Sequence, residues 1–224
     1  MGSLTSSPRV LRGAIVALDA TSPLSRVVAF QYNPDTVTRS LRPRPAPGEA
    51  QVGPGDARRV WGAPVETVTM KIEIDAADQL ADGDPVTQEW GISPQLSALE
   101  MLLYPSSYQV VSDTGLLSAG TIEILPPEGP LTILAWGRGR VVPVRIDSLS
   151  VTEEAFDPRL NPIRASVDLS AQVLSYNDLP SSDAGYPLFL AHQVVHEALA
   201  SVAGYRNRQD VLAVVRDASG GAGG

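Results

Sequence analysis

The sequence contains no cysteine among its 224 residues. Disulfide bonds, thiolate metal sites and cysteine nucleophiles are therefore excluded. Its apolar runs are all shorter than the ~18–20 residues that a membrane-spanning helix needs. Residues 1–12 are polar and lack the apolar core of a secretory signal. We therefore expect the protein to stay in the cytoplasm of the cell that makes it, without inserting into a membrane.

Lysine is almost absent as well, because Lys71 is the only one among the 17 basic residues. This bias toward arginine, with abundant Ala, Gly and Pro, is typical of a GC-rich bacterial genome. The 25 acidic residues outnumber the basic ones and give a net charge of -8. A general nucleic-acid-binding protein needs a basic face to neutralise phosphates, so we expect no nucleic-acid partner.

Histidine occurs only twice, as His192 and His196, four residues apart on an expected helix. This spacing places both imidazoles on one face, where they could hold a metal. Zinc would need a third ligand, however, and Glu197 points about 100° away from His196. Gln193 also stands where an HExxH motif has its glutamate. We therefore interpret the pair as two histidines on a polar helix face and expect no metal.

The acidic residues do not form a recognisable site either. An EF-hand loop starting at Asp75 would require glycine and glutamate where the chain has Leu80 and Val86. Glu153 and Glu154 are adjacent, so on a strand they would point to opposite faces. There is no GxSxG or Walker motif, and residues 137–139 read as a hairpin turn. We therefore expect no catalytic residue, no cofactor and no enzymatic activity.

Period-two alternation is the clearest structural signal, and it predicts two long antiparallel strands with one wet face each. They span residues 66–75 and 163–173. Shorter strands are expected at 13–19, 27–32, 121–125 and 131–136. A further strand at 141–152 changes phase by one residue, which predicts a bulge or bend of the kind that closes a small barrel. The expected inward and outward sets of the two long strands are Val68, Met70, Ile72 and Ile74 against Thr67, Thr69, Lys71 and Glu73, and Ile163, Ala165, Val167, Leu169, Ala171 and Val173 against Arg164, Ser166, Asp168, Ser170 and Gln172.

Two helices are expected. Ser93 would cap the first, with Pro94 at its first position and the helix ending before Pro105. The second would run from about 187 to 203, with Gly204 as its stop. Residues 219–224 are rich in glycine and predict a disordered tail.

Residues 40–64 predict a long loop rich in proline and glycine. It is either a solvated flexible loop or a segment that becomes ordered against a neighbouring subunit. On the second interpretation the candidate contact residues are Arg42, Arg44, Arg58, Arg59 and Trp61.

Three passages in this order resemble the tube and baseplate proteins of contractile injection systems, a phage tail-tube-like family that often carries a C-terminal LysM module. The first passage is FQYNPDTV at 30–37, the second is the strand at 65–75 with the acidic connection after it, and the third is FDPRLNPIRA at 156–165. The residues that carry the likeness are Phe30, Tyr32, Asn33, Pro34, Asp75, Phe156, Asp157, Pro158 and Arg164. The Asn-Pro and Asp-Pro pairs predict turns. We expect Phe30 and Tyr32 in the core, Phe156 at one end of a barrel, and Arg164 paired with a carboxylate at the turn.

The resemblance implies a mainly β fold with one or two helices, a tail-tube-like β-barrel or sandwich flanked by a helix. We expect this β domain at 1–178, a helical extension at 179–217 and a disordered tail at 218–224. The implied function is structural: a homohexameric ring at an end of the inner tube, as a baseplate tube initiator or hub adaptor. Implied partners are further copies of the chain, the inner tube protein, spike, hub or cap proteins, and sheath or baseplate subunits.

The chain departs from the family in leaving no room for a LysM module after residues 210–216. This favours an initiator layer, and an adaptor at the distal capped end of the tube is the alternative. A stand-alone β-sandwich that binds carbohydrate is a further alternative, but it would present exposed aromatics, and only 5% of the residues are aromatic.

Overall fold

A computed structural model describes residues 13–18, 26–29, 34–45, 58–105, 107, 110–111, 129–137 and 139–220 of the chain. Side chains are described throughout these ranges except in 26–29 and 204–220. Phe30, Tyr32, Asn33 and the expected strand at 121–125 lie outside the described residues.

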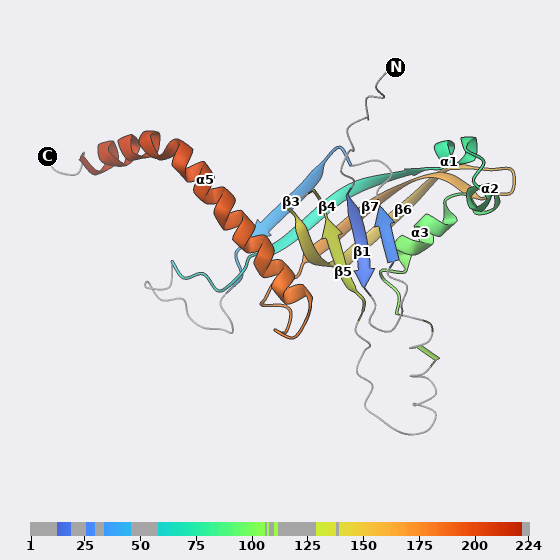
Figure 1. Ribbon diagram of the computed structural model, residues 1–224, viewed down its shortest axis with the longest axis horizontal. Helices are drawn as coiled ribbons and strands as arrows, with labels where there is room; N and C mark the ends of the chain where they lie inside the picture. Colours follow the sequence, from blue (N-terminus) through green and yellow to red (C-terminus); the bar gives the residue numbers. More distant parts are fainter. Residues whose placement is uncertain are drawn as a thin grey trace, which may run out of the picture.

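The fold is mainly β, as predicted, and the strands of the described part of the chain form one seven-stranded antiparallel sheet (Figure 1). The order across the sheet is β2-β1-β5-β6-β7-β4-β3, so β2 and β3 are its two edges. Among the described residues the two edges do not pair with each other, so the sheet is open. The strands are β1 (Ala14–Leu18), β2 (Arg26–Ala29), β3 (Val37–Arg42), β4 (Val65–Asp75), β5 (Leu131–Ala135), β6 (Val141–Phe156) and β7 (Pro162–Val173).

The two long strands predicted from alternation, β4 and β7, pair directly at the centre of the sheet. Val68 lies opposite Ala171, and Ile72 lies opposite Val167. Because facing residues share a side of the sheet, the apolar sets of both strands form one core face. Every member of these sets is buried except Ile163, which is half-buried. The predicted inward and outward faces are thereby confirmed, apart from Ser166, which is described below.

The phase change predicted in the next strand is a β-bulge in β6. The register between β6 and β7 shifts between Ile146 and Ser148, which leaves Asp147 as the additional residue. Ile146 lies opposite Ala171 and Leu149 opposite Leu169, so both point to the core face despite their odd spacing. The strand continues to Phe156, beyond the predicted end at residue 152, because residues 144–156 of β6 pair with β7 from Val173 back to Pro162.

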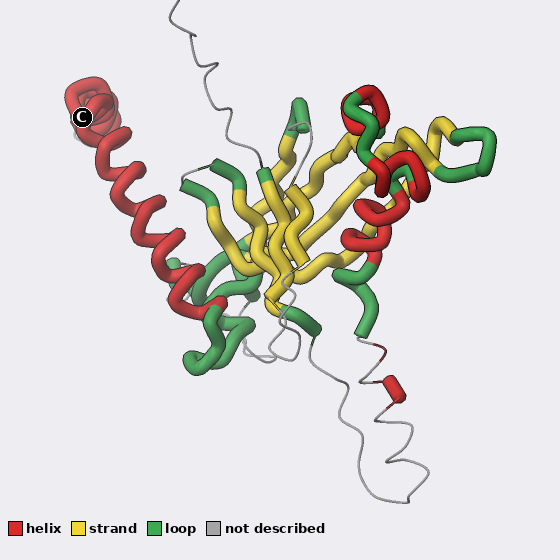
Figure 2. Tube along the Cα trace, turned by 45° about the vertical axis from the view of Figure 1, so that its right-hand side comes forward, coloured by secondary structure: helices red, strands yellow, loops and turns green. Residues whose placement is uncertain are grey.

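Three short helices lie together at one end of the long strands (Figures 1 and 2). They are α1 (Ala77–Ala81), α2 (Pro85–Trp90) and α3 (Ser93–Glu100). Sequence patterns predicted only α3, and they placed its cap one residue too late, since Ile92 is the N-cap and no side chain bonds there. The side-chain cap belongs to α2, where Asp84 accepts hydrogen bonds from the Thr87 backbone N–H at 2.8 Å and from its hydroxyl at 2.7 Å. Leu96 and Leu99 of α3 are buried in the core.

A long helix, α5 (Gly185–Gly220), starts at the other end of the sheet and runs away from it (Figures 1 and 2). The expected stop at Gly204 is wrong, because the helix continues through this glycine to Gly220. A glycine inside a helix costs about 1 kcal/mol relative to alanine, which weakens a helix without ending it. Residues 218–220 of the disordered tail expected at 218–224 are therefore helical. None of the described helices has the length and apolar character needed to cross a membrane.

Candidate functional site

The polar face of the sheet, opposite the core face, carries a shallow hollow of about 330 Å³. It lies over the middle of β4, β7 and β6, with the start of β3 at its border. Lys71, the only lysine, lies opposite Asp168 at its floor, so the charges of the pair offset one another. The lining is otherwise rich in hydroxyl groups and contains no aromatic ring and no histidine. The lining residues are Thr36, Thr38, Thr69, Met70, Lys71, Ser148, Ser150, Asp168, Leu169 and Ser170.

Ser166 was expected to be an outward residue of this polar face, but it is only 5% exposed. Its backbone position is on the expected side of β7, between Glu73 of β4 and Thr152 of β6. A serine is shorter than either neighbour, so flanking side chains cover it. The accessible polar surface of β7 is therefore made by residues such as Asp168 and Ser170.

The turn between β6 and β7 is organised by the carboxylate of Asp157. Its Oδ1 accepts hydrogen bonds from the backbone N–H groups of Arg159 at 2.7 Å and Asn161 at 2.9 Å, and its Oδ2 accepts one from the Asn161 side chain at 2.9 Å. The Asn161 side-chain bond is the main cause that lowers the pKa of Asp157. The predicted Asp-Pro turn is confirmed, and both carboxylate oxygens of Asp157 stabilise it through hydrogen bonds.

The second and third passages of the family resemblance meet in space. Arg164 Nε lies 2.7 Å from Asp75 Oδ2, and the Ala76 backbone N–H donates to the Ile163 carbonyl at 2.9 Å. Arg164 was expected to pair with a carboxylate at the turn; it pairs instead with Asp75, its cross-strand neighbour at the end of β4. The pKa of Asp75 is lowered mainly by the Ala77 backbone N–H, and the Arg164 guanidinium lowers it further.

The segment between α2 and α3 is fastened to the same turn. The Ile92 N–H donates to the Pro162 carbonyl at 2.8 Å, and the Asn161 side chain donates to the Glu89 carbonyl at 3.0 Å. Gly91 has a φ of +59°, and a Cβ there would lie 2.1 Å from the Pro162 carbonyl oxygen. The close approach of two backbones therefore requires glycine at this position.

The aromatic residue of the third passage does not have its expected place. Phe156 was expected to fill one end of a barrel, but its side chain is 48% exposed. It is the last residue of β6, where the register shifts again between Ala155 and Phe156. Of the first passage, the described Pro34 is half-buried next to the start of β3.

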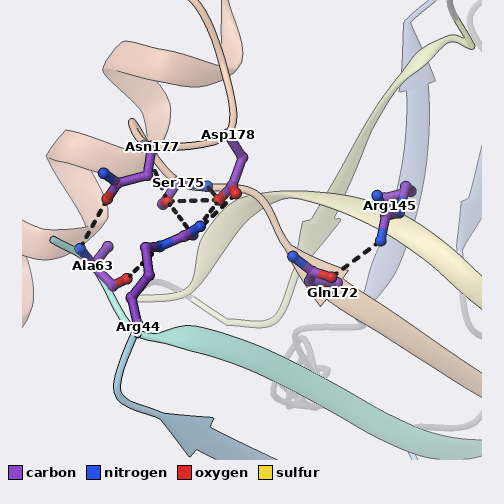
Figure 3. A network of polar contacts seen from close by, with 7 residues as sticks. All are labelled: Arg44, Ala63, Arg145, Gln172, Ser175, Asn177 and Asp178. Carbon is purple, nitrogen blue, oxygen red and sulfur yellow. Dashed lines mark hydrogen bonds and ion pairs between the residues drawn. The ribbon is translucent and has the colours of Figure 1, made fainter. Parts of the chain in front are cut away.

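The long loop is anchored to its own chain at both ends (Figure 3). Arg44 Nη2 lies 2.9 Å from each carboxylate oxygen of Asp178, and Arg44 Nε donates to the Ala63 carbonyl at 3.2 Å. The Ala63 N–H donates to the Asn177 side chain at 3.0 Å. Arg44 was a candidate for contact between subunits, and the structure places it instead in this internal network.

Asp178 is the centre of that network. Burial alone would raise its pKa, but hydrogen bonds from the Ser175 hydroxyl and N–H and from Arg44 more than offset this, so the pKa of Asp178 is lowered. The Ser175 hydroxyl is 2.6 Å from Asp178 Oδ2. The loop base is thus fixed to the segment that leads from β7 into α5.

Figure 3 also shows a contact outside this network, in which Arg145 of β6 donates a hydrogen bond to the side chain of Gln172 of β7 at 3.0 Å.

The remaining loop candidates are on the surface. Arg42, Arg58 and Arg59 are exposed, and Trp61 is 37% exposed next to the buried Ala63. Val60 is 86% exposed. These residues leave a mixed cationic and apolar surface beside the anchored loop base.

Sequence patterns missed a buried charged cluster beneath the start of α5. Glu66 of β4 is only 7% exposed and forms an ion pair with Arg39 of β3. Glu66 occupies the inward phase of its strand, in step with Val68 and Met70, and that phase was the available signal. His192, predicted on a polar face, is also only 7% exposed. Within the described part of the chain, no three His, Asp or Glu side chains are grouped closely enough to hold a metal ion.

Comparison with known proteins adds no relative, since no family model and no curated protein matches this chain.

Proposed function

We propose that this chain is a structural subunit of a contractile injection system, a homohexameric ring at an end of the inner tube where it starts the tube on the baseplate or hub. The observation that carries the proposal is the extended polar face of the central strands. It spans β4, β7 and β6 and is rich in hydroxyl groups. A channel that passes a polar cargo needs a wall of this kind, because apolar or strongly charged walls would retain the cargo.

The open edges of the sheet support assembly through copies of the same chain. An exposed edge strand offers unpaired backbone groups and invites association, which proteins avoid by covering or pairing the edge. Here β3 is an edge, and Ser40, Leu41 and Arg42 are exposed on it. Ring closure with pairing between copies would satisfy these edges.

The packing around the β6–β7 turn supports the family resemblance. Two passages that are about 80 residues apart in the sequence form one unit through Asp75 and Arg164. Asp75 and Asp157 are tied to backbone N–H groups, and Asp75 also to Arg164, and these contacts lower the pKa of both carboxyl groups. Carboxylates held in this way organise turns and are poor general bases near neutral pH, which supports a structural role.

A stand-alone carbohydrate-binding module is less well supported. Such modules stack sugar rings on exposed aromatic side chains, and the lining of the hollow has none. The same ring at the distal capped end of the tube differs from our proposal only in its location. Labelling of the subunit in whole particles, followed by electron microscopy, distinguishes the baseplate from the cap.

The assembly state and the channel wall can be tested separately. Native mass spectrometry of the purified chain should show a hexamer or its intermediates, and a monomer at every concentration would contradict the ring. For the wall, Ser170→Trp fills the hollow, and Ser97→Trp places the same residue on an exposed site of α3 as the control. Both variants should fold, and only Ser170→Trp particles should have normal length and sheath content yet fail in loading or firing. Normal firing of both variants would exclude this face from the channel.

A further inference from the structure

Among the side chains of α5 that the structure describes, those of its first turns attach the helix to the body. Gly185 is buried against Pro143 and Leu179, and Phe189 and His192 are each 7% exposed. Beyond His196, every described side chain of the helix up to residue 203 is exposed. His192 is therefore the last buried side chain before the helix leaves the sheet.

Aromatic rings form a continuous row along this attachment. The ring of Tyr176 packs edge-on against Phe189 at 5.8 Å, and Phe189 lies 6.2 Å from His192. The imidazoles of His192 and His196 are 4.1 Å apart. A charge that develops on His192 would therefore lie between an apolar ring and a second imidazole.

The charged groups that act on His192 come from three elements. They are Arg39 of β3, Glu66 of β4 and His196 of α5, while the Gly139 carbonyl in the β5–β6 turn accepts a hydrogen bond from the imidazole. Arg140, next to Gly139, interacts in turn with Arg39 and Glu66. The cluster thus has two guanidinium groups and one carboxylate, and it already carries an excess positive charge while the histidines are neutral.

One ring nitrogen of His192 is buried without a partner. Nδ1 has no hydrogen-bond partner among the described residues. A neutral imidazole with its proton on Nε2 fits this arrangement. A second proton on Nδ1 would create a buried donor without an acceptor, beside groups that are already cationic.

We propose that His192 is an acid-sensitive latch, which holds α5 on the sheet while its imidazole is neutral and releases the helix when Nδ1 is protonated. This inference does not depend on the proposed role in a tube. It gives the chain a way to change the direction of a long helix without changing the sheet.

The electrostatic environment gives the sign of the pH dependence. Burial, and then His196, lower the pKa of His192, and the Gly139 carbonyl only partly opposes them. A detached helix would return this imidazole to its ordinary pKa of about 6.5. Between the two pKa values the detached state binds the proton more strongly, so docking is favoured above pH ~6.5 and weakens as the pH falls below it. One proton changes the docking equilibrium about tenfold per pH unit in this window.

Amide hydrogen exchange of the full chain measures this equilibrium directly. Rates for residues 185–196 are compared between about pH 5 and pH 7.5, above the ordinary carboxylate range, after correction for the intrinsic pH dependence of exchange. Protection should fall up to tenfold per pH unit below pH ~6.5, whereas β7 should keep its protection. Protection of 185–196 that does not change over this range would overturn the latch.

Two matched variants locate the effect. His192→Gln keeps a donor for the Gly139 carbonyl but cannot titrate, so its protection should not depend on pH; His196→Gln should retain the dependence. An unchanged pH dependence in His192→Gln would contradict the proposal. If His192→Gln fails to dock even at neutral pH, NMR titration of the His192 imidazole in the natural sequence decides. The His192 imidazole must then become protonated below pH ~6.5, over the same pH range in which residues 185–196 lose their protection from exchange. Protonation of His192 without this loss of protection refutes the latch.

Discussion

Replacing Arg44 with glutamine should destabilise the folded chain, although this arginine lies in a segment that reads as a surface loop. The guanidinium bonds to both oxygens of Asp178 at 2.9 Å and to the Ala63 carbonyl at 3.2 Å. The two side chains are only 22% and 18% exposed, so solvent screens the pair incompletely. The change therefore removes an anchor that joins the loop base to the segment before α5.

The size of the effect follows from what each partner retains. A hydrogen bond to a charged group contributes about 1.5–3 kcal/mol, whereas a fully exposed ion pair contributes about 0.2–1 kcal/mol. Asp178 keeps its bonds from the Ser175 hydroxyl and N–H, so it is not left without donors. We expect a loss of about 2 kcal/mol in the free energy of unfolding, which lowers the Tm of a chain of this size by about 4–8 °C.

Thermal unfolding by circular dichroism tests this value, with Arg42→Gln as the matched control. Arg42 is exposed on β3, so its replacement should change stability by no more than about 0.5 kcal/mol. A double-mutant cycle with Asp178→Asn should show that the two effects are not additive. The reasoning is refuted if Arg44→Gln is as mild as the control, or if Asp178→Asn costs the same with and without Arg44.

The same anchor predicts a pH dependence. The folded-state pKa of Asp178 is below its ordinary value of about 3.9, so the carboxylate stabilises the fold above that pH. This contribution is lost as the pH falls through the lowered pKa. Acid unfolding should therefore be less steep in Arg44→Gln than in the natural sequence, because Arg44 is one cause of the lowering.

Three further predictions use the same unfolding assay. Val167→Pro removes a ladder hydrogen bond from a buried central strand and should cost ~3 kcal/mol or more, so a small Tm change would place β7 elsewhere. Gly91→Ala should destabilise more than Gly137→Ala, since both have positive φ but only the first Cβ would strike the Pro162 carbonyl; equal effects would exclude the clash. Shortening the loop within residues 46–57 should leave Tm nearly unchanged while blocking particle formation, and unfolding of the shortened chain would make the loop part of the core.

Periodic patterns predicted the centre of the sheet well because each strand there has one face buried in the core. Alternation is enforced when one set of side chains must be buried, as for Val68 and Ile72. The bulge at Asp147 was also readable, since a phase change must leave one residue unpaired. The end of α5 could not be predicted from Gly204. A glycine ends a helix only where the backbone leaves the helical conformation at that residue, and here the helix continues to Gly220.

The parts of the candidate site that the sequence did not predict depend on distant partners. Arg44 and Asp178 are more than 130 residues apart, and nothing local marks either of them as half of an ion pair. His192 looks polar on a helical wheel, and the groups that act on its imidazole in the fold, Glu66 and Gly139, are distant in the sequence. Glu66 itself was visible as a carboxylate in an inward phase, and such a residue predicts a buried cationic neighbour.

Among the residues that the structure describes, the sheet has an odd number of strands, and every neighbouring pair is antiparallel. The two edge strands, β2 and β3, therefore run in the same direction. A second copy related by rotation about an axis that preserves this direction would place its β2 parallel to β3 of the first, with evenly spaced and slanted hydrogen bonds. Every copy in a ring formed in this way points the same way. One rim then carries all the β6–β7 turns and the other carries all the starts of α5, so two chemically different surfaces meet the neighbours above and below.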